Sequence, residues 1–225
     1  TPEIGQWTSM NDIGKMIYEL TQSLSNLGQD VYVISPYYKI NYGDKTNYLE
    51  NDNNGFIYLN DFIIDFQNEK IVFKIYFGKI NNVKLYFLYN QDIFPDQSIK
   101  VQPDVQIRRI LLLGKASIEL LCQIQIFPSC IISNDWLTGL VPVFGKSDKY
   151  KDIFKYTSFI HIIYNLGNGI FYSDNFSFPR EIDSKLFIDR KNKLCFNSTQ
   201  AALLTCDQWG TVSPSQKEEI LESLE

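Results

Sequence analysis

Two residues whose side chains could do chemistry lie near the ends of short apolar segments that are typical of buried strands. Asp135 follows Cys130–Ser133, and His161, the only histidine of the chain, lies toward the end of Ser158–Ile163. Parallel α/β sheets bind their ligands at the carboxyl ends of the strands, so both residues are candidate site residues. Each also has a structural interpretation, because an aspartate here can cap a turn or helix before Trp136 and a lone histidine can simply belong to the core.

The composition argues against several other kinds of chemistry. Four cysteines at irregular spacing and a single histidine match no zinc-site pattern, so we expect no metal. The 21 basic and 26 acidic residues give a net charge of −5 without a basic run, which argues against a nucleic-acid partner. The sequence holds no apolar run of about 18 residues, so we expect no membrane partner. Reduced thiols favour the cytoplasm, or a plastid if a transit peptide was removed.

Hydrophobic periodicity predicts helices that alternate with strands. Helical spacing is found over Asp12–Leu27, Pro103–Leu121 and Trp136–Phe144. Segments rich in β-branched and aromatic residues predict a three-stranded meander over Phe56–Phe66, Ile71–Ile80 and Val83–Tyr89. Short apolar segments predict further strands over Val31–Ile34, Cys130–Ser133 and Ser158–Ile163. The sequence therefore predicts an α/β fold with a doubly wound, mainly parallel sheet and a β-meander insertion.

The last part of the chain is expected to contain a helix, a strand and a second helix. They follow a long irregular segment, Asn165–Lys193, which is rich in turn-forming residues. Asn197 can cap the first of the two helices, and Trp209–Val212 predicts the strand. Ser213 or Ser215 can cap the second helix.

Several segments resemble one protein family in the same order along the chain. Asn197–Ile220 resembles a pattern that runs from N-x-x-K-A to T-V-S-P and E-I. Ile131–Val141 resembles an H-D-W motif, and Phe159–Phe171 resembles a T-I-H-N segment. Ile17–Pro36 and Arg109–Leu121 resemble helix and strand segments of the same family. On these segments the chain is identified as a member of glycosyltransferase family 5, the glycogen and starch synthases, and the resemblance spans nearly the whole chain.

The resemblance implies a GT-B fold, in which two Rossmann-like domains face each other across a cleft. It implies transfer of glucose from ADP-glucose or UDP-glucose to the non-reducing end of an α-1,4-glucan, without metal or other cofactor. We expect residues 1–225 to be a single N-terminal catalytic domain, a fragment without its first strand and without the C-terminal nucleotide-binding domain. The implied partners are the nucleotide-sugar, the α-glucan acceptor and that C-terminal domain of the same protein.

The resemblance also assigns site residues. His161 coincides with the family histidine that contacts the donor glucose, so it is a candidate catalytic residue. Asp135 and Trp136 match the last two residues of H-D-W, which lies in the glucan and donor cleft; Asp135 is the second catalytic candidate and Trp136 a substrate-binding one. Asn197 matches the asparagine of N-x-x-K and is likewise a candidate for substrate binding.

The segment before the first long helix departs most from the family pattern K-x-G-G, whose lysine meets the donor phosphates. Ser9 stands in place of the lysine, and Asn11 and Asp12 stand in place of the glycines. A charge-assisted contact of this kind contributes about 1.5–3 kcal/mol, so its loss is unfavourable for binding a diphosphate. These three residues are candidates for substrate binding by their register, but Asn11 or Asp12 can instead cap the helix.

Three functions remain open from the sequence. Retention of Asp135, His161 and Asn197 favours an active glucan synthase. Five simultaneous departures from the family pattern favour an inactive member that binds glucan or scaffolds an active synthase. They are Ser9, Asn11 and Asp12, together with Asn134 and Ile162, which replace a histidine and an asparagine. A non-enzymatic module that keeps only the fold is the third possibility. We expect the chain by itself to transfer no glucose.

Overall fold

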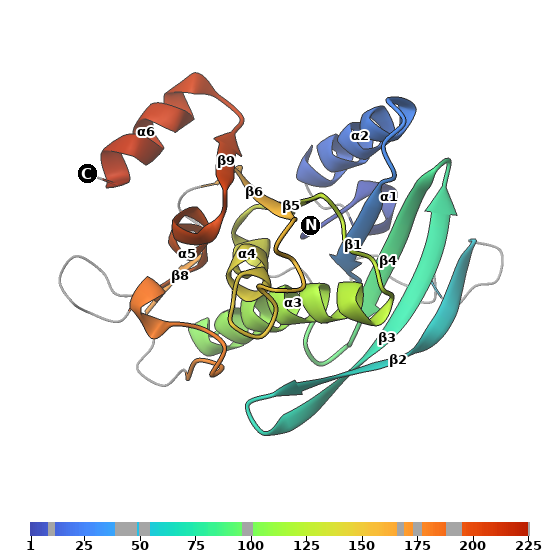
Figure 1. Ribbon diagram of the computed structural model, residues 1–225, viewed down its shortest axis with the longest axis horizontal. Helices are drawn as coiled ribbons and strands as arrows, with labels where there is room; N and C mark the ends of the chain where they lie inside the picture. The colour runs from blue at the N-terminus through green and yellow to red at the C-terminus, as the bar shows by residue number, and fades with distance from the viewer. Residues whose placement is uncertain are drawn as a thin grey trace. The chain divides into compact units, whose positions relative to one another are not determined.

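The computed structural model describes residues 1–8, 12–38, 49, 55–95, 101–165, 169–172, 177–187 and 195–224 (Figure 1). The chain divides into two compact units, residues 1–100 and residues 101–225. Ser9 and Asn11, two of the predicted substrate-binding residues, lie outside the described residues.

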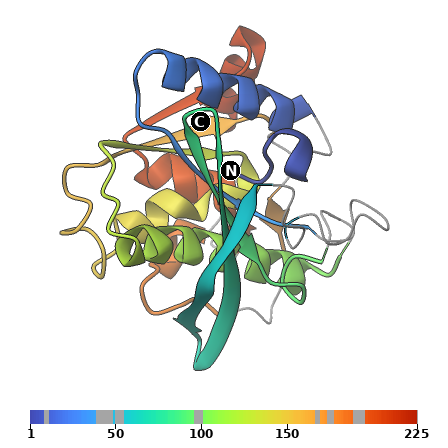
Figure 2. The same ribbon diagram turned by 90° about the vertical axis from the view of Figure 1, so that its right-hand side faces the viewer.

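The first unit contains a four-stranded sheet. Its elements are α1 (Gly5–Thr8), α2 (Asp12–Asn26), β1 (Tyr32–Pro36), β2 (Phe56–Phe66), β3 (Glu69–Ile80) and β4 (Val83–Tyr89). The strand order is β1-β4-β3-β2, in which β1 and β4 are parallel and the other pairs antiparallel. The predicted meander is therefore confirmed, and Figure 2 shows β2 and β3 as a long twisted ribbon.

Local backbone chemistry sets the ends of these elements. Gly28 adopts a positive φ of 83° just after α2, a conformation that costs glycine little and commonly ends a helix. Gln67 and Asn68 both have positive φ, as the two-residue turn between β2 and β3 requires. A shared apolar cluster joins the helices to the sheet, and it includes Trp7, Ile17, Val33, Phe56 and Phe87.

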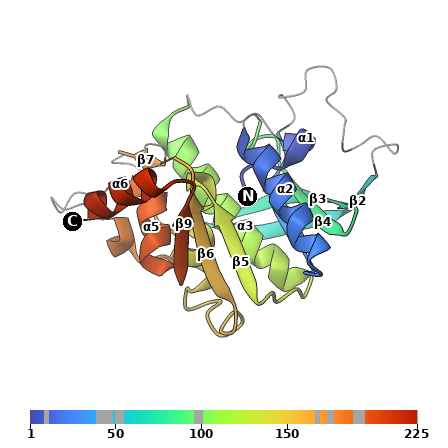
Figure 3. The same ribbon diagram turned by 90° about the horizontal axis from the view of Figure 1, so that it is seen from above.

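The second unit carries the other parallel strands. Its longer elements are α3 (Pro103–Gln123), β5 (Cys130–Asn134), α4 (Leu140–Gly145), β6 (Ser158–Ile163), α5 (Ser198–Thr205), β9 (Gln208–Thr211) and α6 (Pro214–Leu224). Its shorter ones are η3 (Trp136–Thr138), β7 (Ile170–Phe171), η4 (Ser184–Phe187) and β8 (Phe196–Asn197). Figure 3 shows β5, β6 and β9 side by side, and both strand pairs are parallel. The α/β class with mainly parallel strands is thus confirmed outside the meander.

One predicted helix is divided in two. Trp136–Phe144 forms the 3-10 turn η3 and then α4, rather than one continuous helix. Pro142 accounts for the break, because it has no N–H to donate to Thr138 as a continuous α-helix from Trp136 would require. Gly114 of α3 allows α4 to pack closely, since an added Cβ would lie 3.0 Å from Leu140 Cβ.

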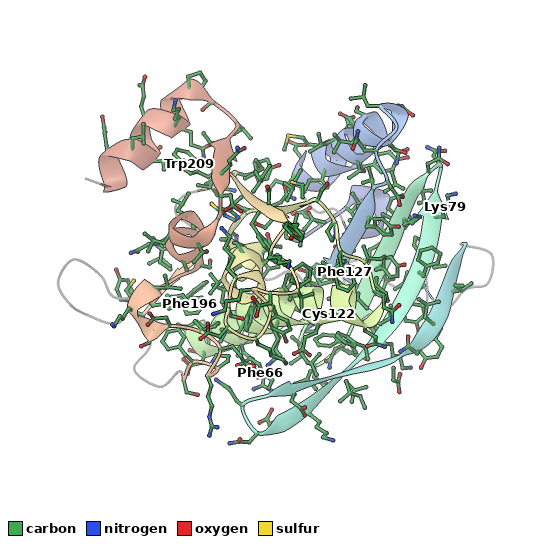
Figure 4. All side chains as sticks on the ribbon, viewed as in Figure 1. Phe66, Lys79, Cys122, Phe127, Phe196 and Trp209 are labelled. Carbon is green, nitrogen blue, oxygen red and sulfur yellow. The ribbon has the colours of Figure 1, made fainter. Side chains whose placement is uncertain are left out.

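Aromatic stacking and a helix cap stabilise the C-terminal part of the second unit. Phe196, labelled in Figure 4, is fully buried and stacks on Phe187 with ring centroids 4.9 Å apart. The predicted cap of the last helix is confirmed for Ser213, because its Oγ accepts a hydrogen bond from Gln216 N at 3.2 Å. None of the helices within the described residues is both long and apolar enough to cross a membrane.

Candidate functional site

His161 is held in the core of the second unit, opposite Ser133. The two residues are register partners in the parallel pair β5–β6. His161 is fully buried, and its Nδ1 lies 2.8 Å from Ser133 Oγ. Burial lowers the pKa of the imidazole to about 4, because a charged ring would be poorly solvated there. His161 is therefore neutral at neutral pH and suits hydrogen bonding better than ion pairing.

The second ring nitrogen of His161 lacks a hydrogen-bond partner among the described residues. Within the described residues, His161 Nε2 is buried and has no hydrogen-bond partner. A buried polar atom without a partner costs about 1–3 kcal/mol, and such atoms call for a specific explanation such as a ligand group. The geometry therefore supports the interpretation of His161 as a ligand-contacting residue.

Asp135 lies directly after β5 in a strained conformation. Its φ of 60° and ψ of 174° fall in a region of backbone space that is essentially restricted to glycine. A residue held there costs on the order of 1–3 kcal/mol, and such strain is concentrated at functional sites. Two backbone hydrogen bonds hold Asp135 in this strained conformation. Asp135 N donates to Ile162 O at 2.8 Å, and Thr138 N donates to Asp135 O at 3.1 Å.

The buried side chain of Asp135 links the segment after β5 to the segment after β6. Its Oδ1 accepts a hydrogen bond from Asn165 N at 3.2 Å. Tyr164 OH donates to Asn134 Oδ1 at 3.1 Å. Burial, and then the negative charge of Asp135, raises the pKa of Tyr164 to about 12. Asp135 thus follows β5 directly, and His161 lies within the neighbouring parallel strand β6, two residues before its end at Ile163. Their catalytic roles stay predictions.

Asn197 caps α5, as one of its two interpretations required. Its side-chain Oδ1 accepts a hydrogen bond from Gln200 N at 3.0 Å. This contact satisfies one of the free N–H groups of the first helical turn. Its expected contact with substrate stays a prediction, which the capping role does not oppose.

Trp136 is largely covered by its own unit. It is 9% exposed, and its ring lies 6.0 Å from that of Phe171 at an angle of 57°. Gly169, with φ of 90°, lies so close that an added Cβ would be 2.5 Å from Trp136 Cβ. Packing of this kind fixes the position of the residue that follows Asp135, and the substrate contact of Trp136 stays a prediction.

Asp12 is the described member of the three substrate-binding candidates near the first helix. It begins α2 and is exposed. A carboxylate in the first turn of a helix is favourable, because the helix dipole places positive charge there. This placement accounts for Asp12 without a ligand, and its substrate contact stays a prediction.

Sequence reasoning missed Ser133, Thr138 and Asn165 as supporting residues. Thr138 Oγ1 accepts from Asn134 N at 2.7 Å and donates back to Asn134 O at 2.6 Å, which braces the strained turn. Ser133 could have been found by aligning the two apolar strands in parallel, since it falls opposite the lone histidine. Within the described residues, no group of three or more His, Cys, Asp and Glu side chains could hold a metal ion.

Comparison with solved structures defines the class of fold. The catalytic domain of starch synthase IV from Arabidopsis thaliana, bound to ADP and acarbose, matches with a TM-score of 0.75 and 19% identity. The match covers 97% of this chain and 45% of that one. The chain therefore has an α/β fold that matches slightly less than half of a GT-B catalytic domain.

Comparison with known sequences then gives the family. Residues 1–225 match the family model described as the starch synthase catalytic domain, and the chain belongs to this family. A glycogen synthase of Thermotoga petrophila is 31% identical over 144 residues, which are 62% of this chain and 29% of that protein. The glycogen synthase of Treponema denticola is 28% identical over 98% of this chain and 45% of its own length. This chain thus spans less than half the length of these relatives.

Proposed function

We propose that this chain is the N-terminal part of a glycogen or starch synthase, which transfers glucose from ADP-glucose or UDP-glucose to an α-1,4-glucan. The observation that carries the proposal is the buried His161, whose Nε2 lacks a hydrogen-bond partner within the described residues. The whole of this chain, residues 1–225, matches the starch synthase catalytic domain family. The related Arabidopsis domain was solved with ADP and acarbose, which supports a nucleotide and a sugar as ligands of this family member as well.

The residues of the site have chemically distinct roles in this proposal. His161, neutral through burial, bonds a hydroxyl group of the donor glucose. Asp135 carries a carboxylate that accepts hydroxyl hydrogen bonds, and its strained backbone is fixed in advance of binding. Such positioning is what this class of transfer requires, because a small misplacement of the reacting groups costs on the order of a hundredfold in rate.

The proposal includes partners that the chain itself does not contain. We propose a C-terminal nucleotide-binding domain of the same protein as the partner that completes the site. We also propose that residues 1–225 form a single catalytic domain, which is a fragment of the longer protein. All four cysteines are free thiols, which supports the cytoplasm as the compartment.

Incorporation of labelled glucose into glycogen tests this function. The full-length gene product is assayed with ADP-glucose and UDP-glucose in parallel, and residues 1–225 are assayed alone. We expect incorporation by the full-length product from at least one donor and none by the isolated chain. Glycogen binding without incorporation from either donor would contradict the proposal and identify an inactive glucan-binding member instead.

A further inference from the structure

Ser133 lies within hydrogen-bond distance of the imidazole of His161. It is 2% exposed and lies opposite His161 across β5 and β6. Among the described residues its Oγ has two hydrogen-bond partners, His161 Nδ1 at 2.8 Å and the carbonyl oxygen of Ile160 at 3.2 Å. The family resemblance gives this position no role.

The hydroxyl of Ser133 has one proton, so the two contacts restrict where the imidazole proton lies. If the hydroxyl donates to Ile160 O, its oxygen can accept from a protonated His161 Nδ1, and both hydrogen bonds form. If the hydroxyl instead donates to an unprotonated Nδ1, the bond to Ile160 is lost. The ring proton then lies on Nε2, a buried position without an acceptor among the described residues.

The first arrangement is favoured because it satisfies more buried polar groups. It forms two hydrogen bonds where the second forms one, and each contributes about 0.5–1.5 kcal/mol. The imidazole is also neutral, as its lowered pKa of about 4 indicates, so only one ring nitrogen carries a proton at neutral pH. Nε2 is then an acceptor.

We propose that Ser133 is a positioning residue that holds His161 in the Nδ1-protonated tautomer, so that Nε2 accepts a hydrogen bond from a substrate hydroxyl. A neutral acceptor takes O–H or N–H groups and rejects phosphate and carboxylate oxygens, which can only accept. The site at Nε2 therefore selects the sugar part of the donor over its diphosphate. The tautomer can be measured whether or not the protein is active. The assignment of the bound hydroxyl to glucose rests on the proposed function.

Nitrogen-15 NMR of the protein without substrate tests the tautomer directly. A long-range proton–nitrogen correlation spectrum distinguishes protonated from unprotonated ring nitrogens, and His161→Gln assigns the signals by removing them. We expect a protonated Nδ1 and an unprotonated Nε2 at neutral pH. A protonated Nε2 in the wild type would overturn the proposal, and this result needs no Ser133 variant.

Variants of Ser133 then test whether this residue sets the tautomer of His161. Ser133→Ala should shift the ring toward the Nε2-protonated form, and Ser133→Thr, which keeps the hydroxyl on a strand, should restore the wild-type spectrum. Ser158→Ala, at the exposed start of β6, is the matched control and should change nothing. A Ser133→Ala protein that folds and keeps the wild-type spectrum would overturn the role of Ser133.

Kinetics of the full-length product add a second readout. Loss of one net hydrogen bond predicts a roughly three- to tenfold lower kcat/KM for Ser133→Ala, with recovery in Ser133→Thr. If the wild type transfers no glucose, the proposed function fails while the spectrum still decides the tautomer. If the wild type is active and Ser133→Ala is unchanged in kcat/KM, Ser133 does not position His161 for catalysis.

Discussion

Burial of His161 makes the stability of the second unit depend on pH. Its ordinary pKa of 6.5 applies in the unfolded chain, whereas burial lowers the folded value to about 4. Between these two values the unfolded chain binds more protons than the folded one. Lowering the pH through this window therefore favours unfolding, and the loss levels off below about pH 4.

The size of this effect follows from the two pKa values. Each unit of pKa difference is worth about 1.4 kcal/mol of differential stability. Integrated from about pH 7.5 to about pH 4.5, the shift of His161 predicts a loss of roughly 2.5 kcal/mol in the free energy of unfolding.

Urea unfolding at those two pH values measures the loss, with the His161→Gln variant as the reference. Glutamine keeps a polar side chain but does not titrate. Carboxylates such as Asp207, whose pKa is lowered by its hydrogen bond to Lys146, are present in both proteins and cancel in the comparison. We expect the wild type to lose about 2.5 kcal/mol more than the variant between the two conditions. Equal losses in the free energy of unfolding of both proteins would contradict the claim that His161 is buried and neutral in the folded chain.

Other substitutions test the architecture around the site by urea unfolding. Asp135→Gly should be about 1–3 kcal/mol more stable than Asp135→Ala, because both lack the carboxylate and only glycine relieves the backbone strain at φ of 60°. Asn197→Ala should cost about 1 kcal/mol through loss of the helix cap. Gly139→Ala should cost about 1–3 kcal/mol, because its Cβ would lie 2.4 Å from the backbone oxygen of Ser198.

Each of these predictions has a specific contradiction. Equal stability of the glycine and alanine variants at 135 would mean that the wild-type backbone is unstrained. Asn197→Ser should retain most of the cap, so a serine variant as unstable as the alanine variant would place the loss elsewhere. A neutral Gly139→Ala variant would contradict the close approach of the 139 backbone to α5.

Much of the fold was predictable because the signals were local. Period-two alternation over Phe56–Phe66 and Val83–Tyr89 gave the bounds of β2 and β4, and Ser158–Ile163 gave those of β6. Gly28 correctly ended the first long helix near Asn26. The split at Trp136–Thr138 was missed because the apolar pattern continues through Pro142, whose missing N–H acts on the backbone and leaves no trace in hydrophobicity.

The placement of the two candidate catalytic residues was predictable in part. Both were expected near the ends of strands, and the structure places Asp135 directly after β5 and His161 within the neighbouring parallel strand β6, while their catalytic roles stay predictions. The strained backbone of Asp135 was not predictable, because it depends on hydrogen bonds to Ile162 and Thr138 that form only in the folded unit. The contact of Ser133 with His161 was missed because it depends on the register between β5 and β6, which the sequence reveals only when the two apolar segments are aligned in parallel.

The most direct test of the account compares glucose transfer by two aspartate variants of the full-length product. Asp135→Ala removes the strained, buried carboxylate after β5, and Asp148→Ala removes a carboxylate that is 95% exposed and paired with Lys151. With the donor that the wild type uses, we expect a loss on the order of a hundredfold or more for Asp135→Ala and wild-type incorporation for Asp148→Ala. Wild-type incorporation by Asp135→Ala would contradict the assignment of the catalytic site to the carboxyl ends of β5 and β6.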